Sequence, residues 1–95
     1  MPDLRFEWDE SKNRANKRKH GVSFEEALTV FYDDRALLIE DPEVDAEDRF
    51  VLLGLSAVLR TLVVCHCYRE GEQVIRIISA RRATRKERSE YESRW

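Results

Sequence analysis

The residues best suited to chemistry lie in two segments, and the first of them is Lys17-Arg18-Lys19-His20-Gly21. Four consecutive side chains here are cationic or titratable, and histidine is the side chain that changes its charge between about pH 5 and 8. Interaction with the dipole at a helix C-terminus, worth about 0.3–1 kcal/mol, accounts for one or two such charges but not for four. We therefore consider Lys19 and His20 as candidate groups for proton transfer.

The second segment is Val74–Thr84, in which arginines interrupt an apolar strand. Strict alternation predicts that Arg76 lies on one face of this strand, with Ile77 and Ser79 on the other. A charged side chain on an apolar strand costs free energy unless it is paired or functional. Ser79 and Arg81 stand where the strand ends, a position at which rigid elements hold functional groups well. Arg76, Ser79 and Arg81 are therefore candidate catalytic residues.

A third segment, Cys65-His66-Cys67, suggests a metal site only at first sight. Zinc sites normally space their cysteines by two to four residues and need four ligands. On a regular strand His66 points away from both thiols, and side chains two residues apart are about 6.5–7 Å from each other, too far for a disulfide. The sequence therefore predicts two structural free thiols and no metal site.

Local signals predict the elements that must position these groups. Alternating apolar and polar residues predict a short strand over 4–9, and Asp9 then caps a polar helix over 10–19 that Gly21 ends. A second helix begins with the capping box Ser23-Phe24-Glu25-Glu26. Its apolar stripe at helical spacing consists of Phe24, Ala27, Leu28 and Phe31.

Strands are predicted after these helices. A short run over 36–39 precedes an acidic loop over 40–48, and three apolar runs rich in β-forming residues follow over 49–58, 61–69 and 74–80. The connections between the last three runs are short enough for hairpins. We therefore expect an antiparallel sheet of about four strands.

A capping box at Thr84-Arg85-Lys86-Glu87 predicts a last helix over 85–94. With 95 residues the chain has the size of one small domain. We therefore expect 1–95 to form a single α+β domain that has two N-terminal helices, the antiparallel sheet and a C-terminal helix. A core of this size supplies only a few kcal/mol, so a stabilising partner is expected.

Charge is unevenly distributed along the chain, although 17 Lys and Arg against 19 Asp and Glu give a net charge of −2. The segment 9–20 carries five basic and two acidic residues, and 76–95 carries seven basic and three acidic ones. Between them, 33–49 carries eight acidic residues and two basic ones. The near-neutral total therefore allows two cationic stretches that bind a polyanion. The alternative is that these charges only solvate helix faces and that strand arginines pair with Glu47 or Asp48 of the acidic loop.

Composition and motifs exclude several classes of protein. Apolar runs stay well short of the roughly 18 residues that cross a bilayer, so no membrane association is expected. The N-terminus lacks the pattern of a signal peptide, which favours a cytoplasmic location. Phosphate-cradling glycine loops and nucleophile elbows are absent from the sequence, and no cofactor is expected.

Three groups of motifs form a pattern over nearly the whole chain. They are Phe6-Glu7-Trp8-Asp9-Glu10 with Lys12-Asn13 and Asn16, Lys19-His20-Gly21-Val22-Ser23-Phe24-Glu25-Glu26-Ala27, and Arg76-Ile77-Ile78-Ser79-Ala80-Arg81-Arg82-Ala83-Thr84 with Glu87 and Tyr91. In this order and at this spacing the motifs resemble the BrnT family, small bacterial toxins of type II toxin–antitoxin modules. After Asp41-Pro42 this sequence has Val44 where family members often carry a histidine, so the resemblance gives no support to a catalytic role for this loop.

The resemblance implies a RelE-like microbial ribonuclease fold and a cytoplasmic toxin that cleaves RNA without a metal ion and arrests translation and growth. It also implies neutralisation by a cognate, BrnA-like antitoxin that doubles as a DNA-binding repressor. A 2:2 toxin–antitoxin heterotetramer is expected, which would contact operator DNA only through the antitoxin.

The chemistry of RNA suggests roles for the candidate residues. Cleavage begins when the deprotonated 2′-OH attacks the adjacent phosphate. It also requires that the negative charge developing on the phosphate is stabilised and that the leaving 5′-oxygen is protonated. Fixed cations usually supply the largest part of this stabilisation. We expect Arg76 and Arg81 to stabilise the phosphate, with Ser79 beside them. His20 or Lys19 is expected to transfer the proton.

Further contacts to RNA are expected from the basic stretches and from one aromatic side chain. Trp8 offers a surface on which a base can stack, although packing in the core is the alternative role for this residue. The other residues that we expect to bind RNA are Lys12, Lys17, Arg18, Arg82 and Arg85.

Two other functions stay open on the sequence alone. One is a non-catalytic RNA- or DNA-binding module in which the same basic residues bind without cleaving. The other is an inactive relic that still binds its antitoxin.

Overall fold

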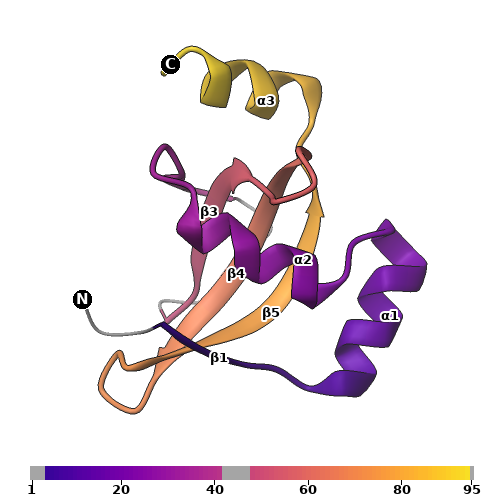
Figure 1. Cartoon of the computed structure of the whole chain (residues 1–95), viewed down its shortest axis with the longest axis vertical. Helices are drawn as coiled ribbons and strands as arrows, with labels where there is room; N and C mark the ends of the chain where they lie inside the picture. Colours follow the sequence, from indigo (N-terminus) through magenta and orange to yellow (C-terminus); the bar gives the residue numbers. More distant parts are fainter. Residues whose placement is uncertain (1–3, 42–47, 95) are drawn as a thin grey trace.

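Residues 4–41 and 48–94 are described by a computed structural model, in which a five-stranded sheet is flanked by three α-helices (Figure 1). The strands are β1 (Arg5–Glu7), β2 (Leu37–Ile39), β3 (Phe50–Leu55), β4 (Thr61–Arg69) and β5 (Val74–Arg82). The helices are α1 (Glu10–His20), α2 (Phe24–Thr29) and α3 (Arg85–Glu92), with a 3₁₀ turn, η1 (Val30–Tyr32), after α2.

The α-helices begin at the residues that the sequence predicts, because each start is fixed by a local hydrogen bond. The Asp9 side chain accepts from the first turn of α1, and Gly21, in the left-handed conformation at φ 70°, ends that helix. Ser23 caps α2, and Thr84 forms the predicted capping box at the start of α3. The ends differ more from prediction, since α2 passes into η1 and α3 stops before residue 94.

The sheet is larger and less regular than predicted. Its order is β1-β5-β4-β3-β2, and β1 runs parallel to β5 while every other neighbouring pair is antiparallel. The predicted antiparallel arrangement is confirmed for β2 to β5, but the sheet has a fifth strand, β1, for which the sequence predicted neither a partner nor a direction. Arg5 pairs with Val74, and no signal within either segment indicates a partner so distant in sequence.

The apolar core lies mainly on the face of the sheet that α2 and η1 cover. A second, smaller cluster lies on the other face, where Tyr91 of α3 packs and its hydroxyl donates to Asp33 at 2.5 Å. The main cluster consists of Val22, Phe24, Ala27, Val30, Leu62, Val64, Ile77 and Ala80. The second consists of Val51, Leu53, Val63 and Tyr91.

Buried amide side chains, rather than apolar ones, attach helix α1 to β5 and to the start of α2. Asn16 Nδ2 donates to the carbonyl groups of Val22 and Ala80 at 2.9 and 2.8 Å, and its Oδ1 accepts from the Ala80 N–H at 3.2 Å. Asn13 Oδ1 accepts from the Phe24 N–H at 2.8 Å. Because β1 pairs with β5 only along 74–76, Asn16 satisfies backbone groups further along the same strand.

We predict that Asn16→Ala lowers the free energy of unfolding by about 2–4 kcal/mol, since it leaves buried backbone groups without partners. Urea unfolding followed by circular dichroism measures this loss. Arg14→Ala, at an exposed position of the same helix, is the matched control and is expected to change stability by no more than about 0.5 kcal/mol. Equal effects of the two substitutions would show that Asn16 does not anchor the helix.

His66 is fully buried among aromatic rings, and Cys65 and Cys67 beside it are buried free thiols, as predicted. The imidazole lies edge-on to Phe31 at 4.7 Å between ring centroids and close to the rings of Phe50 and Tyr68. Its Nδ1–H donates to the Val64 carbonyl at 3.3 Å, while Nε2 is buried and has no hydrogen-bond partner among residues 4–41 and 48–94. Burial holds the pKa of His66 below its ordinary value because the charged form is desolvated.

This burial predicts that the protein loses stability as the pH falls below about 6.5. The unfolded chain then binds a proton at His66 that the folded chain excludes, so the folded state is disfavoured. We expect His66→Phe to flatten the dependence of the unfolding free energy on pH between 7.5 and 5.5. If the unfolding free energy of His66→Phe depended on pH as steeply as that of the wild-type protein, His66 would not be the group that causes this loss of stability.

Candidate functional site

A cavity of about 230 Å³ brings together four of the five residues predicted to be catalytic. Lys19 and His20 line it from the end of α1, and Ser79 and Arg81 line it from β5. The other lining residues are Asp41, Val51, Val63, Cys65 and Ala80.

The amide of Asn16 accounts for this juxtaposition. It hydrogen-bonds both backbone groups of Ala80, the residue between Ser79 and Arg81. His20 lies four residues after Asn16, so both occupy the same face of α1. Anchoring Asn16 on Ala80 therefore places the imidazole next to the catalytic candidates of β5.

An irregularity in β5 aligns its polar side chains and corrects the predicted alternation. Ile77 pairs with His66 and Ser79 with Cys65, so the intervening Ile78 is an extra residue, a β-bulge. The bulge moves Ser79 to the face opposite Ile77, whereas strict alternation places the two together. Ser79 consequently shares a face with Arg81 and Arg76.

Arg81 is held by two carboxylates. Its Nη1 and Nη2 donate to Glu87 at 2.8 and 2.9 Å, and Nη2 also donates to Asp41 at 3.2 Å. The Glu87 carboxylate raises the pKa of Arg81 further above its ordinary value, and Arg81 in turn lowers the pKa of Glu87 to about 2. The guanidinium is therefore a permanent, oriented cation at the wall of the cavity.

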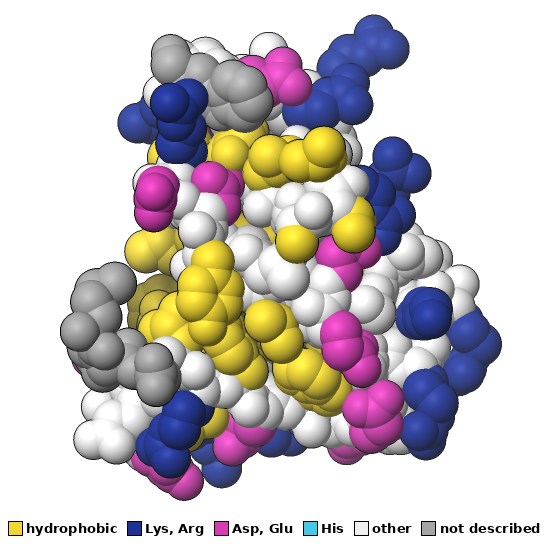
Figure 2. Space-filling view, in the orientation of Figure 1, with side chains coloured by type: hydrophobic (Ala, Val, Ile, Leu, Met, Phe, Trp, Pro, Cys, Tyr) yellow, Lys and Arg dark blue, Asp and Glu magenta, His cyan; other side chains and the backbone are white. Residues whose placement is uncertain are grey.

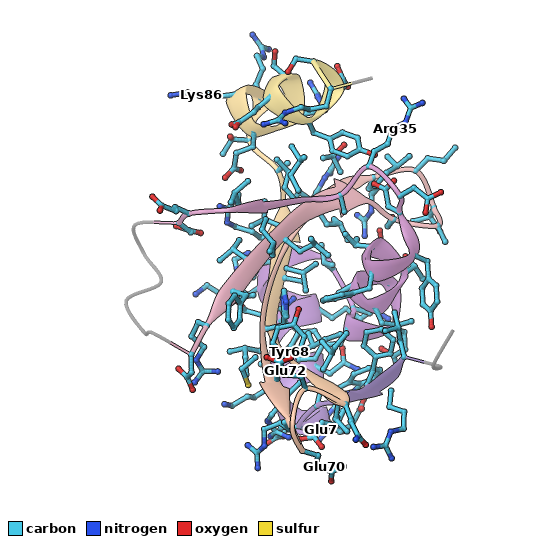
Figure 3. All side chains as sticks on the ribbon, turned by 90° about the vertical axis from the view of Figure 1, so that its left-hand side faces the viewer. Glu7, Arg35, Tyr68, Glu70, Glu72 and Lys86 are labelled. Carbon is cyan, nitrogen blue, oxygen red and sulfur yellow. The ribbon has the colours of Figure 1, made fainter. Side chains whose placement is uncertain are left out.

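Arg76, the fifth catalytic candidate, does not line the cavity. Its Nη1 donates to Glu7 of β1 at 2.7 Å, near the end of the sheet opposite α3 (Figure 3). This partner differs from Glu47 and Asp48, the acidic residues proposed from sequence; Glu47 lies outside the described residues. Asp41, just before the undescribed part of the acidic loop, contacts Arg81 instead.

The residues predicted to bind RNA are spread over a wide surface. Lys12, Lys17 and Arg18 are exposed on α1, where Lys and Arg side chains gather along one edge of the molecule in Figure 2. Arg82 lines a separate hollow of about 190 Å³ with Arg60 and Arg88. Arg85 is exposed at the start of α3, and its neighbour Lys86 points sideways from that helix (Figure 3) and lines a hollow with Leu38 and Ile39 of β2.

Trp8 packs largely as a core residue. Its ring contacts the main apolar cluster and lies edge-on to Phe24, with 6.1 Å between ring centroids. Its Nε1–H donates to Glu10 at 3.0 Å, so only part of the indole is available to a base.

Sequence reasoning missed three residues that shape this site, namely Asn16, Asp41 and Glu87. Asn16 and Glu87 belong to the quoted motifs and Asp41 to the acidic loop, but only their contacts in the folded chain give them a role in the site. Cys65 also lines the cavity, and burial raises the pKa of its thiol, which is therefore protonated at neutral pH.

Within 4–41 and 48–94 no group of three or more His, Cys, Asp or Glu has the arrangement of a metal site. No helix in these ranges is long and apolar enough to cross a membrane.

Comparison with known proteins identifies what the chain is similar to. A family model described as the ribonuclease toxin BrnT of type II toxin–antitoxin systems matches residues 8–87. The crystal structure of the Brucella abortus ribonuclease toxin BrnT superimposes with a TM-score of 0.66 over 87% of this chain and 100% of that one, at 24% sequence identity, and shows a similar fold. No curated protein matches the chain.

The ion pair between Arg81 and Glu87 predicts a specific loss of stability in acid. Because the pKa of Glu87 falls from 4.5 to about 2 on folding, its carboxylate stabilises the fold above pH 4.5, and this contribution disappears as the pH falls through 2. Thermal unfolding across this window is expected to show a smaller pH dependence in Glu87→Gln, which keeps a capping side chain at the same position. The same pH dependence in both proteins would show that the pair contributes nothing.

Proposed function

The chain belongs to the BrnT family of ribonuclease toxins of type II toxin–antitoxin systems, and from this membership we propose that its active site is the cavity between α1 and β5. One observation carries the proposal: Lys19, His20, Ser79 and Arg81 line the same cavity although about 60 residues separate the two pairs. Cleavage there requires no metal ion, since the side chains supply both a fixed cation and a proton-transfer group.

Each of these four residues has a role that its chemistry supports. Arg81 binds the scissile phosphate and stabilises the charge that develops on its oxygens. His20, with Lys19 as a second cation beside it, donates the proton that the leaving 5′-oxygen requires. The Ser79 hydroxyl donates a hydrogen bond to the phosphate from the same face of β5 as Arg81.

Binding outside the cavity is proposed to follow the exposed cations. Arg76 shares the face of Ser79 and Arg81 and is proposed to contact a flanking phosphate after exchanging its bond to Glu7. Trp8 supplies a partial stacking surface. The remaining contacts to RNA are assigned to Lys12, Lys17, Arg18, Arg82 and Arg85.

Membership of a type II system implies an antitoxin as partner. We further propose a RelE-like microbial ribonuclease domain over 1–95, which acts in the cytoplasm, cleaves RNA and thereby arrests translation and growth. A BrnA-like, DNA-binding antitoxin is proposed to neutralise it in a 2:2 heterotetramer. Operator DNA then contacts only the antitoxin.

Cleavage of labelled RNA in the presence of EDTA tests the proposal. The wild-type protein is expected to cleave, and Arg81→Lys to lower kcat/KM by about 100-fold, because a single ammonium group cannot replace the oriented guanidinium. Arg94→Lys, at an exposed arginine outside the site, is the matched control and keeps wild-type activity.

Three results would contradict the proposal. A requirement for metal would exclude the mechanism, and salt-sensitive binding without product would indicate a non-catalytic nucleic-acid-binding module instead. Equal activity of Arg81→Lys and Arg94→Lys would place the active site elsewhere.

A further inference from the structure

We propose that Asp41 is the general base that removes the proton from the attacking 2′-OH; the inference rests on the proposed function of the cavity as a ribonuclease site. The sequence gives no support to a catalytic role for the acidic loop. The structure nevertheless places Asp41 in the lining of the cavity, in contact with Arg81 of β5.

With His20 assigned as the general acid, the chemistry of the remaining lining residues singles out Asp41. A base must accept a proton at the working pH, and Lys19 and Arg81 are cations that have no free lone pair. Burial raises the pKa of Cys65, so its thiol stays protonated, and a serine hydroxyl such as that of Ser79 is a very weak base. Among the described residues that line the cavity, Asp41 contributes the one carboxylate.

The two carboxylates bound to Arg81 have different surroundings. Both oxygens of Glu87 accept from the guanidinium, and its Oε1 also accepts from the Thr84 N–H at 2.9 Å. Its pKa of about 2 makes it a poor base, and it does not line the cavity. Asp41 contacts the same guanidinium at a longer distance, 3.2 Å from Nη2 to its Oδ2. Glu87 therefore fixes the position of the guanidinium. A phosphate oxygen can then replace the Asp41 carboxylate as the acceptor of the Nη2–H bond while Arg81 stays bound to Glu87.

Asp41 is also held near the cavity by the sheet. It stands two residues after Ile39, the last residue of β2, which pairs with Val51 of β3. Val51 itself lines the cavity. A short tether to a paired strand limits how far the carboxylate can move, as a general base requires.

The proposed step is balanced in atoms and charge. A phosphate oxygen takes the place of Asp41 on Nη2 of Arg81, and the released carboxylate accepts the proton of the 2′-OH. The 2′-oxygen forms a bond to phosphorus while the bond from phosphorus to the 5′-oxygen breaks. Protonated His20 gives its proton to the 5′-oxygen. The products are a 2′,3′-cyclic phosphate and a free 5′-OH, and exchange with water restores both side chains.

The experiment compares Asp41→Asn with the wild-type protein and with Glu40→Gln, which changes an exposed neighbouring carboxylate outside the cavity. We expect Asp41→Asn to lower kcat on a labelled RNA at least 100-fold, with no loss of affinity for the 2′-O-methyl RNA of the same sequence, which cannot be cleaved. Glu40→Gln keeps wild-type cleavage.

Cleavage by Asp41→Asn at or above the wild-type rate would overturn the inference and would show that Asp41 only screens Arg81. A variant that loses affinity as well as cleavage would overturn it too. If Asp41→Asn unfolds at a lower temperature than the wild-type protein, a second variant is needed. Asp41→Glu restores the carboxylate and must then recover cleavage. A wild-type protein that does not cleave RNA contradicts the proposed function itself, whereas an active wild type with an active Asp41→Asn contradicts only the assignment of the base.

Discussion

The arrangement of this molecule depends on a single amide side chain, that of Asn16, which continues the hydrogen bonding of the sheet. A primary amide presents a donor and an acceptor side by side, as a peptide group does, so it can satisfy both backbone groups of Ala80. Helix α1 has almost no apolar surface and cannot be held by hydrophobic packing. Its attachment is therefore directional, and this fixes the rotation of the helix as well as its position. The placement of His20 against β5 follows from that fixed rotation.

Paired charges explain how an acidic protein presents a cationic site. Each of Arg60, Arg76 and Arg81 on or beside the central strands has a carboxylate partner, since a partly buried guanidinium without one is costly. The Glu26 carboxylate that binds Arg60 has its pKa lowered by that contact. These pairs orient the arginines and neutralise much of their charge in the free protein. The net charge of −2 thus reflects partners within the fold and gives no measure of affinity for a polyanion.

Prediction from sequence succeeded for elements whose cause is local. The caps at Asp9, Ser23 and Thr84 act within four residues, and the apolar runs over 61–69 and 74–80 match β4, which is buried on both faces, and β5. It failed where the cause is distant. The parallel pairing of β1 with β5 joins residues about 70 positions apart. The bulge at Ile78 is visible only in the register between β4 and β5, and the predicted alternation was wrong there for that reason.

The candidate site shows the same division between what local sequence predicts and what distant contacts decide. By itself the sequence determined which side chains are able to do chemistry, because residue type decides charge, proton transfer and capping: it identified Lys19, His20, Ser79 and Arg81. Only the tertiary structure decided which of them share a cavity, that Arg76 is bound to a carboxylate outside it, and that Asp41 lies within it. The physical reason is that a site closes through contacts between segments that fold together in space. Such contacts produce no periodic pattern or motif within the sequence of either segment, so neither segment alone predicts them.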